Sequence, residues 1–380
     1  MSGPARARRM AKLVLVRADT PPRSSRRASA RPVPRRVPEP GTNGAPALDL
    51  LIVHTPASTR FTQEAMRDAA ATVLGGRGLK HRLVAIPETR DAERSVRRQV
   101  ARAIHEGCLR IVAAGGDGTV GMVAQCLARR RSGPPVSLGI IPAGTTNLLA
   151  RELGIPLGLE DAMAVIADAE SAIEIDAILV GRRYFFTQVG IGPDALMIRD
   201  TPRERQEKIG RLAYLLTFAQ RALRFQPRWF TLTLDGQVIR ERAWQLMAAN
   251  VGAIGSPPFT WGPRIDPTDG TLDLCVFNVR RRMDLVRLAW RFLTNRHRKD
   301  GNARFYRVRD RAVIESAHPV LVQGDGEIIG QTPVTLRIVP GALRVLVASA
   351  VEGTLPAPPP AAAEGAEAAT ATPSAGAEAA

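Results

Sequence analysis

Cysteine and aromatic residues are scarce in this chain of 380 residues. Its three cysteines, Cys108, Cys126 and Cys275, have no paired spacing. That argues against a disulfide framework or a metal cluster and favours a reducing cytoplasm. We expect all three to be buried as small hydrophobic side chains. Phe, Trp and Tyr make up only 4% of the residues, which disfavours a surface on which nucleic-acid bases stack. We therefore expect no specific nucleic-acid partner.

Long hydrophobic runs are also missing. No apolar stretch approaches the roughly 18 residues that a membrane-spanning helix needs. The early run Leu13-Val14-Leu15-Val16 is too short for a signal-peptide core of about 7–15 residues. We therefore expect a cytoplasmic protein.

Positive charge is plentiful but unevenly placed, with a formal net charge of +17. Residues 1–45 carry eleven Lys and Arg against two acidic residues, and residues 280–311 carry twelve against three, so each segment has a net charge of +9. Basic segments attract polyanions such as an anionic membrane face. We interpret the first segment as a solvated tail and predict that 280–311 contacts an anionic membrane.

Composition and periodicity divide the chain into five parts. Residues 1–46 and 351–380 lack periodicity, so we expect both to be disordered. Between 47 and 170, apolar strands alternate with amphipathic helices, which predicts a parallel sheet covered on both faces. One of these helices, at 91–105, is expected to be capped by Asp91. Residues 171–333 predict a β-rich domain, and 334–350 a strand that returns to the first domain.

Within the β-rich part we expect a mostly antiparallel sandwich. Its strands are predicted at 173–180, 183–189, 230–234, 238–250, 271–279, 305–315 and 319–329. Two helices interrupt them, at 205–225 and 283–293. The first has an apolar stripe with Lys and Arg along its polar edge, so packing in the core and contact with a membrane surface both stay open.

A glycine-rich turn follows the apolar strand predicted at 109–113. It reads Gly115-Gly116-Asp117-Gly118-Thr119 and opens into a segment with apolar residues at helical spacing. A strand-to-helix turn without Cβ atoms lets backbone N–H groups approach an anion, and the helix N-terminus adds a favourable dipole. Asp117 is unusual in such a turn because a carboxylate repels phosphate, so a metal ion or a donor network must accompany it. A plain turn with Asp117 as the helix cap is the alternative.

A second turn of the same kind follows the strand predicted at 136–141. It reads Pro-Ala-Gly-Thr-Thr-Asn-Leu-Leu-Ala-Arg-Glu-Leu-Gly-Ile-Pro over 142–156, and in a parallel sheet both turns emerge at the same carboxyl edge. Together the two motifs resemble the catalytic domain of the diacylglycerol kinase family, in the bacterial lipid kinase branch that includes sphingosine kinase relatives. The resemblance extends loosely over 48–347. It implies an α/β + β fold of the NAD-kinase and diacylglycerol-kinase type, with a Rossmann-like nucleotide domain followed by a β-sandwich domain.

The resemblance implies an ATP-dependent lipid kinase that needs Mg²⁺. Such an enzyme transfers the γ-phosphate to a hydroxyl of diacylglycerol or a related lipid at the inner face of a membrane. The resemblance is also compatible with a homodimer. The chain has neither a G-x-x-x-x-G-K-[ST] loop nor protein-kinase motifs, so backbone donors must cradle the nucleotide. Of the family's first loop, Asn-Pro-x-Ser-Gly, only Pro56 and Ser58 match. We predict that ATP contacts Thr55, Ser58, Gly115, Gly116, Asp117, Gly118, Thr119, Gly144, Thr145 and Asn147.

A carboxylate of the second domain is expected to act as the base. Asp-Gly between strands is by default a hairpin turn, which is our interpretation of Asp235-Gly236. The segment Gln-Gly-Asp-Gly-Glu at 323–327 differs because it places two carboxylates beside glycines that leave room for substrate. In related kinases this Asp-Gly-Glu supplies the catalytic base. The resemblance therefore assigns catalytic roles to Asp325 and Glu327, without choosing between them as the base, and to Asp117.

A further loop, Asp-Pro-Thr-Asp-Gly-Thr at 266–271, resembles one that binds a structural Mg²⁺ in bacterial relatives. There one carboxylate and neighbouring backbone carbonyls hold the ion, because hard oxygen ligands suit a hard cation. The resemblance implies that Asp269 supplies the carboxylate, flanked by Asp266 and Thr271. A β-turn without a metal is the alternative.

Two departures from the family pattern leave other functions open. Met122 and Leu148 stand where the family often has Glu and Asp, and the loss of these carboxylates could alter metal binding or mark a branch with modified chemistry. One alternative is an NAD kinase-like enzyme, although the chain lacks the Asn-Glu pair and the Thr-Pro-Thr-Gly-Ser-Thr-like run expected of it. The others are a non-catalytic nucleotide- or lipid-binding regulator and an anion-binding protein that acts through its Arg-rich segments.

Overall fold

The computed structural model describes residues 35–36, 48–56, 60–130, 132–169, 171–200, 225–254, 260–262, 265–279, 283–284, 287, 290–291 and 301–348. Most of the helices predicted at 205–225 and 283–293 lies outside these residues, as do Ser58 and nearly all of both predicted tails. None of the helices described within these ranges is long and apolar enough to cross a membrane.

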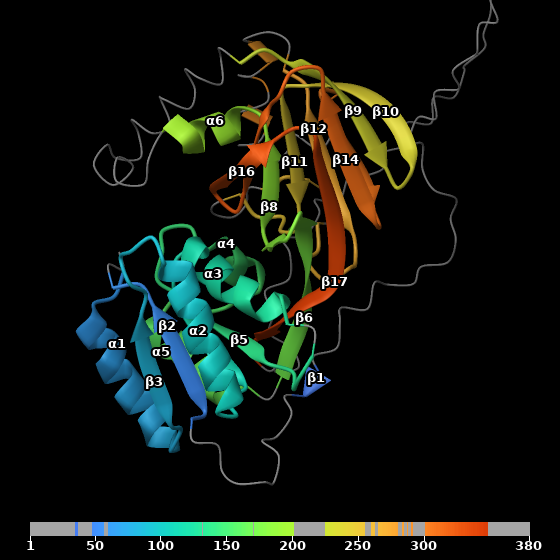
Figure 1. Cartoon of the computed structure of the whole chain (residues 1–380). Coiled ribbons are helices and arrows are strands. Elements are labelled where there is room, and N and C mark those ends of the chain that lie inside the picture. Colours follow the sequence, from blue (N-terminus) through green and yellow to red (C-terminus); the bar gives the residue numbers. More distant parts are fainter. Residues whose placement is uncertain are drawn as a thin grey trace, which may run out of the picture. The chain divides into compact units, whose positions relative to one another are not determined.

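The first half of the described chain alternates strands with helices (Figure 1). The elements are β2 (Leu50–His54), α1 (Gln63–Ala69) with a π-helical turn (Ala70–Leu74), β3 (His81–Ala85), α2 (Ala92–His105), β4 (Arg110–Gly115), α3 (Asp117–Ala128), β5 (Ser137–Pro142), α4 (Leu148–Glu152) and α5 (Leu159–Asp168). The four strands pair in parallel in the order β5-β4-β2-β3, which confirms the predicted parallel sheet.

Alternating residues of the buried strands pack on opposite faces of this sheet. In β4, Ile111 and Ala113 join a core cluster that includes Val100 of α2 and Val123 of α3. Their neighbours in β4 belong to a second cluster that contains Met163 of α5. A strand buried on both faces has no polar side to alternate with, which is why it appears in the sequence as a continuous apolar run.

The second half consists mainly of strands. They are β6 (Ser171–Val180), β7 (Arg183–Phe185), β8 (Gln188–Ile191), β9 (Arg228–Leu234), β10 (Gln237–Ala243), β11 (Gln245–Ala249), β12 (Leu272–Phe277), β13 (Ala303–Val308), β14 (Arg311–Ser316), β15 (Leu321–Gly324), β16 (Glu327–Gln331) and β17 (Val334–Leu346), with α6 (Pro193–Asp200) between β8 and β9. Strands β13-β12-β11-β8-β15-β16 form an antiparallel sheet. Its apolar residues pack against those of β9, β14 and β17, so the α/β + β fold is confirmed.

The long strand β17 belongs to both halves of the molecule. Its first part pairs antiparallel with β14, and Arg344 near its end pairs in parallel with Ser137 of β5. β17 therefore joins the parallel strands to β14, β9 and β10 in one mixed sheet along the path β10-β9-β14-β17-β5-β4-β2-β3, with β6 beside β17. This sheet is separate from the antiparallel sheet β13-β12-β11-β8-β15-β16. This shared strand joins the nucleotide-type domain to the β-rich domain.

Several predicted strands are interrupted by turns. The strand expected at 183–189 is two strands, β7 and β8, separated at residues 186–187, and 238–250 contains β10 and β11. The stretches 305–315 and 319–329 each contain a turn, the second at Asp325-Gly326. Continuous apolar periodicity did not reveal these breaks, because hydrogen bonds to distant segments fix them.

Three smaller predictions also need correction. Asp91 precedes α2, but its side chain makes no capping hydrogen bond. Arg35–Arg36, inside the tail predicted to be disordered, form a short strand (β1) that pairs with β6. Cys126 is only partly buried, whereas the other two cysteines are buried as expected.

Candidate active site

The two predicted glycine turns touch each other. Gly116 directly precedes α3, and Gly144 follows β5. A Cβ atom added to Gly144 would lie 2.4 Å from the Cα of Gly116, and one added to Gly116 would lie 3.3 Å from the Cα of Gly144. A side chain at either position would push the two backbones apart. The turns therefore form one continuous backbone surface at the carboxyl edge of the sheet.

Two hydroxyl groups from different elements meet beside the first turn. The Oγ1 atom of Thr55, which follows β2, lies 2.6 Å from the Oγ1 atom of Thr119 in the first turn of α3. Thr119 also packs on Gly115, where an added Cβ would lie 2.5 Å from that hydroxyl. The first turn of a helix leaves backbone N–H groups without intrahelical partners. Hydroxyl and N–H donors thus gather at one edge, a combination that suits phosphate oxygens.

Asp117 links the two turns through a hydrogen bond. Its Oδ1 atom accepts a bond of 2.7 Å from the backbone N–H of Leu148, the first residue of α4. Burial raises the pKa of Asp117, and the charge of Asp325 raises it further, while the Leu148 donor lowers it. The carboxylate therefore has the donor partner that its place in a phosphate-type turn requires.

Asn147 closes the second turn on itself. It has a left-handed backbone with φ of 51°. Its side-chain Oδ1 accepts a bond of 3.0 Å from the N–H of Gly144, and its Nδ2 donates one of 2.8 Å to the Gly144 carbonyl. Asn147 thus holds the shape of the turn, while the neighbouring Thr145 is exposed.

Asp325 lies at the tip of the hairpin between β15 and β16. Its φ of 45° and the φ of 84° at Gly326 are both positive, as a two-residue type I′ turn requires. The carboxylate accepts backbone N–H bonds from Phe186 (2.8 Å), Thr187 (3.0 Å) and Gln188 (2.9 Å), and a 2.5 Å bond from the Thr187 hydroxyl. Phe186 and Thr187 form the connection between β7 and β8, and Gln188 is the first residue of β8, which explains the break in the predicted strand 183–189.

The surroundings of Asp325 perturb its ionisation. Burial raises the pKa of Asp325, although its four hydrogen-bond donors oppose the shift. Its effect on the pKa of Asp117 places the two carboxylates within electrostatic reach of each other. The acidic hairpin of the second domain is therefore close enough for its charge to act on the first glycine turn.

The hairpin between β9 and β10 repeats the same local geometry in a different environment. Asp235 has a φ of 47°, and its carboxylate accepts backbone N–H bonds from the turn at 309–311. It is exposed, and although partial burial acts against the shift, these donors lower its pKa. The predicted hairpin role of Asp235 is confirmed. Burial and a neighbouring carboxylate distinguish Asp325 from it.

Glu327 lies apart from this arrangement. It is exposed and forms an ion pair of 2.6 Å with Arg183, at the start of β7. Arg183 also stacks over the ring of Phe185, at 5.3 Å from its centroid. Of the two candidate bases, Asp325 accepts hydrogen bonds from residues 186–188, whereas Glu327 forms an ion pair with Arg183 at the surface.

Two residues without a predicted role support the Asp325 hairpin. The Nε2 atom of Gln323 donates a bond of 3.0 Å to Asp194, and its Oε1 accepts one of 3.0 Å from the N–H of Gly326. Gln323 is 1% exposed. Asp194 fits only because position 190 is glycine, where an added Cβ would lie 1.8 Å from its Oδ2. The sequence shows Gln323 two residues before the Asp-Gly pair, but no local feature indicates that it is buried, because Gln is usually exposed.

The predicted metal loop forms local turns. Asp266 Oδ1 accepts bonds from the N–H and hydroxyl of Thr268, and Asp269 Oδ1 accepts the same pair from Thr271. The other oxygen of Asp269 lies 3.8 Å from Arg307. Among the described residues, no group of three or more His, Cys, Asp or Glu could hold a metal. These side chains do not by themselves assemble a cation site, so the Mg²⁺ at this loop stays a prediction.

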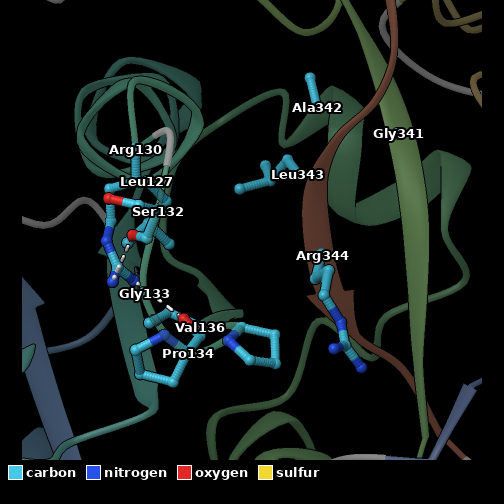
Figure 2. Close-up of a pocket in the computed structure, with 11 residues that line it drawn as sticks. Leu127, Arg130, Ser132, Gly133, Pro134, Val136, Gly341, Ala342, Leu343 and Arg344 are labelled. Atoms are coloured by element: carbon cyan, nitrogen blue, oxygen red, sulfur yellow. Dashed lines mark hydrogen bonds between the residues drawn. The ribbon is translucent and has the colours of Figure 1, made fainter.

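A separate cavity of about 240 Å³ lies at the amino end of β5. Figure 2 shows Leu127 and Arg130 on one side of it, and Leu343 and Arg344 of β17 on the other. The cavity holds none of the predicted site residues, because both glycine turns emerge at the carboxyl end of the same sheet.

Two family models match the chain. The diacylglycerol kinase catalytic domain matches residues 49–180, and the YegS C-terminal NAD kinase beta sandwich-like domain matches residues 187–347. The chain therefore belongs to the diacylglycerol kinase family, as its two glycine motifs predict. Its second domain places it in the bacterial lipid kinase branch of that family.

Individual relatives are similar over much of the chain. A diacylglycerol kinase of Bacillus subtilis is 29% identical over 59% of this chain and 72% of its own length, and a probable lipid kinase YegS of Salmonella typhimurium is 29% identical over 72% and 89%. The uncharacterized Synechocystis protein sll0036 is 28% identical, and the matched region is 55% of its length. A crystal structure of a diacylglycerol kinase from Bacillus anthracis shares the fold, with a TM-score of 0.63 at 22% identity over 78% of this chain and 96% of that one.

Proposed function

We propose that the protein is an ATP-dependent lipid kinase that transfers the γ-phosphate to a hydroxyl group of diacylglycerol or a related lipid. Membership of the family and the names of its relatives support this proposal. The observation that supports it is that the turns at Gly116 and Gly144 touch each other beside Asp117, whose pKa is affected by the charge of Asp325 from the other domain.

The nucleotide phosphates would lie on the backbone surface of the two turns. Backbone N–H groups at the start of α3 and the hydroxyls of Thr55 and Thr119 are the donors that fit phosphate oxygens. Asp117 fits a contact to Mg²⁺ through its second oxygen, because Leu148 occupies the first. The ion, when bound, neutralises charge on the phosphates.

Asp325 is the base in this proposal. Its carboxylate removes the proton from the lipid hydroxyl as the oxygen attacks the γ-phosphate, and ADP leaves. The raised pKa suits this task, because a base works best when its pKa approaches the working pH. The donors at 186–188 hold the carboxylate in one orientation.

The reaction would take place at the cytoplasmic face of a membrane, where the lipid resides. Half of the basic residues on which our prediction of a membrane contact at 280–311 rests lie outside the described ranges. The homodimer stays a prediction.

The test is transfer of label from γ-labelled ATP with Mg²⁺ to a panel of lipids in mixed micelles, with NAD as a competing acceptor. Wild type should label diacylglycerol or a related lipid. Asp325→Asn and Asp117→Ala should each lose about 10²–10⁴-fold in turnover, the range of a lost general base or charge-stabilising group. Asp235→Asn is the matched control, because it makes the same change in the same hairpin geometry outside the site, and it should keep full activity.

Three outcomes would contradict the proposal. Labelled NAD without labelled lipid would indicate an NAD kinase. ATP binding by a folded protein without transfer to any lipid would indicate a regulator. Equal losses in Asp325→Asn and Asp235→Asn would remove the catalytic role from Asp325.

A further inference from the structure

One surface of the β-rich domain carries arginines that form no ion pair with any carboxylate in the described part of the chain. It is the exposed side of β10, β9, β14 and β17, where β10 is the edge strand (Figure 1). The residues concerned are Trp229, Val238, Arg240, Arg242, Arg311 and Arg337, and we call this surface the arginine face. Cross-strand pairing puts them on one side: Trp229 lies opposite Arg242, and Arg311 opposite Arg337. The exposed Glu315 of β14 is on the same side, because it lies opposite Thr231, which in turn lies opposite Arg240.

The other side of the same strands is apolar and buried. Phe230, Leu232, Ile314 and Leu336, which alternate with residues of the arginine face, are at most 1% exposed and pack in the core of the domain. Because strand side chains alternate between faces, the arginine face cannot turn inward. Its charge is therefore a fixed property of the surface.

The arginines of this face lack acidic partners. Across the residues that the structure describes, no carboxylate lies within ion-pair distance of Arg240, Arg242, Arg311 or Arg337. Arg311 and Arg337 face each other directly, and like charges in that position destabilise a sheet. A surface that keeps such a pair gains stability when an anion binds.

Two nearby arginines, by contrast, have acidic partners. Arg304 pairs with the buried Glu241, and Arg307 lies 3.5 Å from Asp273. Both belong to the basic segment 280–311, so part of that segment is engaged within the molecule. Arg311 of the same segment is turned to the arginine face instead.

Apolar side chains are exposed among these charges. Trp229 is 57% exposed and Val238 is 66% exposed. The guanidinium of Arg240 lies 5.6 Å from the centre of the Trp229 ring. At one end of the face a groove of about 400 Å³ is lined by Arg228, Trp229, Arg242, Ser316 and His318, among others. A tryptophan beside arginines at a groove of this size suits the interface of a bilayer, where the ring lies at headgroup level and the arginines contact phosphates.

We propose that the arginine face docks on an anionic membrane surface, with lipid phosphates at Arg240, Arg242, Arg311 and Arg337 and Trp229 inserted among the headgroups. Nucleic acid is the other common polyanion, but recognition of single strands uses several stacking aromatics, and Trp229 is the one aromatic on this face. The inference goes beyond the proposed kinase activity: it concerns binding, which needs no turnover. Membrane docking by this face can therefore be disproved without affecting the kinase proposal, and the kinase proposal can be disproved without affecting membrane docking.

The test is co-sedimentation of the full chain with phosphatidylcholine vesicles, with and without roughly 30 mol % phosphatidylglycerol, in the absence of nucleotide. Each surface arginine gains about 1 kcal/mol near an anionic leaflet, so Arg240→Gln/Arg242→Gln should weaken binding to anionic vesicles by about 30-fold. The matched control is Arg97→Gln/Arg98→Gln on α2, which removes the same charge from another exposed surface. It should change binding by less than about threefold. All variants should keep the wild-type melting temperature, because Arg240, Arg97 and Arg98 are exposed and the half-buried Arg242 forms no ion pair with a described carboxylate.

A second measurement reports on insertion. Brominated lipids should quench the wild-type tryptophan fluorescence, and Trp229→Phe should lose most of that quenching. Equal weakening by both double variants would mean that net charge alone drives binding, and would overturn the proposal. Quenching that is the same in Trp229→Phe as in wild type would also overturn the proposal. A third contradicting result would be that Arg240→Gln/Arg242→Gln loses binding to a DNA duplex but still binds anionic vesicles.

Discussion

Replacing Gly144 with alanine should separate the two turns of the nucleotide site. The added Cβ would lie 2.4 Å from the Cα of Gly116, 3.3 Å from the Gly116 nitrogen and 3.0 Å from the Oδ1 of Asn147. Carbon atoms in contact prefer about 3.5–4.0 Å, so the overlap with Gly116 exceeds about 1 Å. Backbone atoms make up two of the three contacts, and they cannot rotate away.

The structure sets the size of the effect. Overpacking in a well-packed region costs about 1–3 kcal/mol, so the free energy of unfolding should fall by that amount. To relieve the overlap the turns must move apart by about 1 Å, and a misplacement of that size can reduce turnover by about 100-fold. We therefore expect Gly144→Ala to lose more activity than stability.

The measurements are urea unfolding, calorimetric titration with ATP, and lipid phosphorylation. The matched control is Gly121→Ala in α3, where an added Cβ meets nothing within 4 Å. Alanine in a helix interior should stabilise that variant by about 0.5–1 kcal/mol and leave ATP binding unchanged. If Gly144→Ala binds ATP and turns over within twofold of wild type, the contact between the turns has no functional role and the reasoning fails.

Three further changes test the ionisable groups and their supports. Thr187→Val removes the hydroxyl that donates a hydrogen bond to ionised Asp325, so the pKa of Asp325 should rise further. The acid limb of the pH profile of kcat/KM should then move to higher pH. An acid limb that does not move would contradict the role of Asp325 as the base. Burial, with a smaller contribution from the Asp269 charge, raises the pKa of Asp273 to about 6, although Arg307 opposes this. The contribution of Asp273 to the stability of wild type therefore falls as pH rises from about 4 to about 6. Asp273→Asn does not ionise, so the difference in unfolding free energy between this variant and wild type should shift in favour of the variant by up to about 3 kcal/mol between pH 4 and pH 7. Denaturant titration at both pH values measures this shift. Gln323→Leu should lower kcat with little change in the KM for ATP, because it frees the hairpin without touching the turns; an equal rise in KM would make Gln323 merely structural.

Local sequence was sufficient to locate the parts of the site. Gly115-Gly116-Asp117-Gly118-Thr119 follows a strand and opens a helix, as predicted, because each feature depends on neighbours within a few residues. The hairpin at Asp235 was likewise predictable, since Asp-Gly between strands favours a type I′ turn. The same rule applies to Asp325, so the turn signal did not separate the two residues. The second carboxylate at Glu327, the flanking glycines and the family resemblance did.

What could not be predicted depends on distant partners. The break at Phe186 and Thr187 exists because their N–H groups bond to Asp325, which lies more than 130 residues further along the chain. The support of the hairpin by Gln323 and Asp194 has the same origin. A periodicity argument weighs neighbouring residues, so it extended these strands through turns that remote hydrogen bonds create.

The sequence by itself determined the alternation of strands and helices, the two glycine turns and the family. These follow from residue spacing and from backbone freedom at glycine. Only the tertiary structure decided that Gly116 touches Gly144, and that the charge of Asp325 acts on Asp117 while Glu327 pairs with Arg183. It also decided that four arginines share one face on which none forms an ion pair with a described carboxylate. The physical reason is that the burial of a side chain, its hydrogen bonds and its ion pairs depend on residues that are close in space and distant in sequence. The shared strand β17 brings such residues close, because it pairs with β14 of the β-rich domain and with β5 of the first domain.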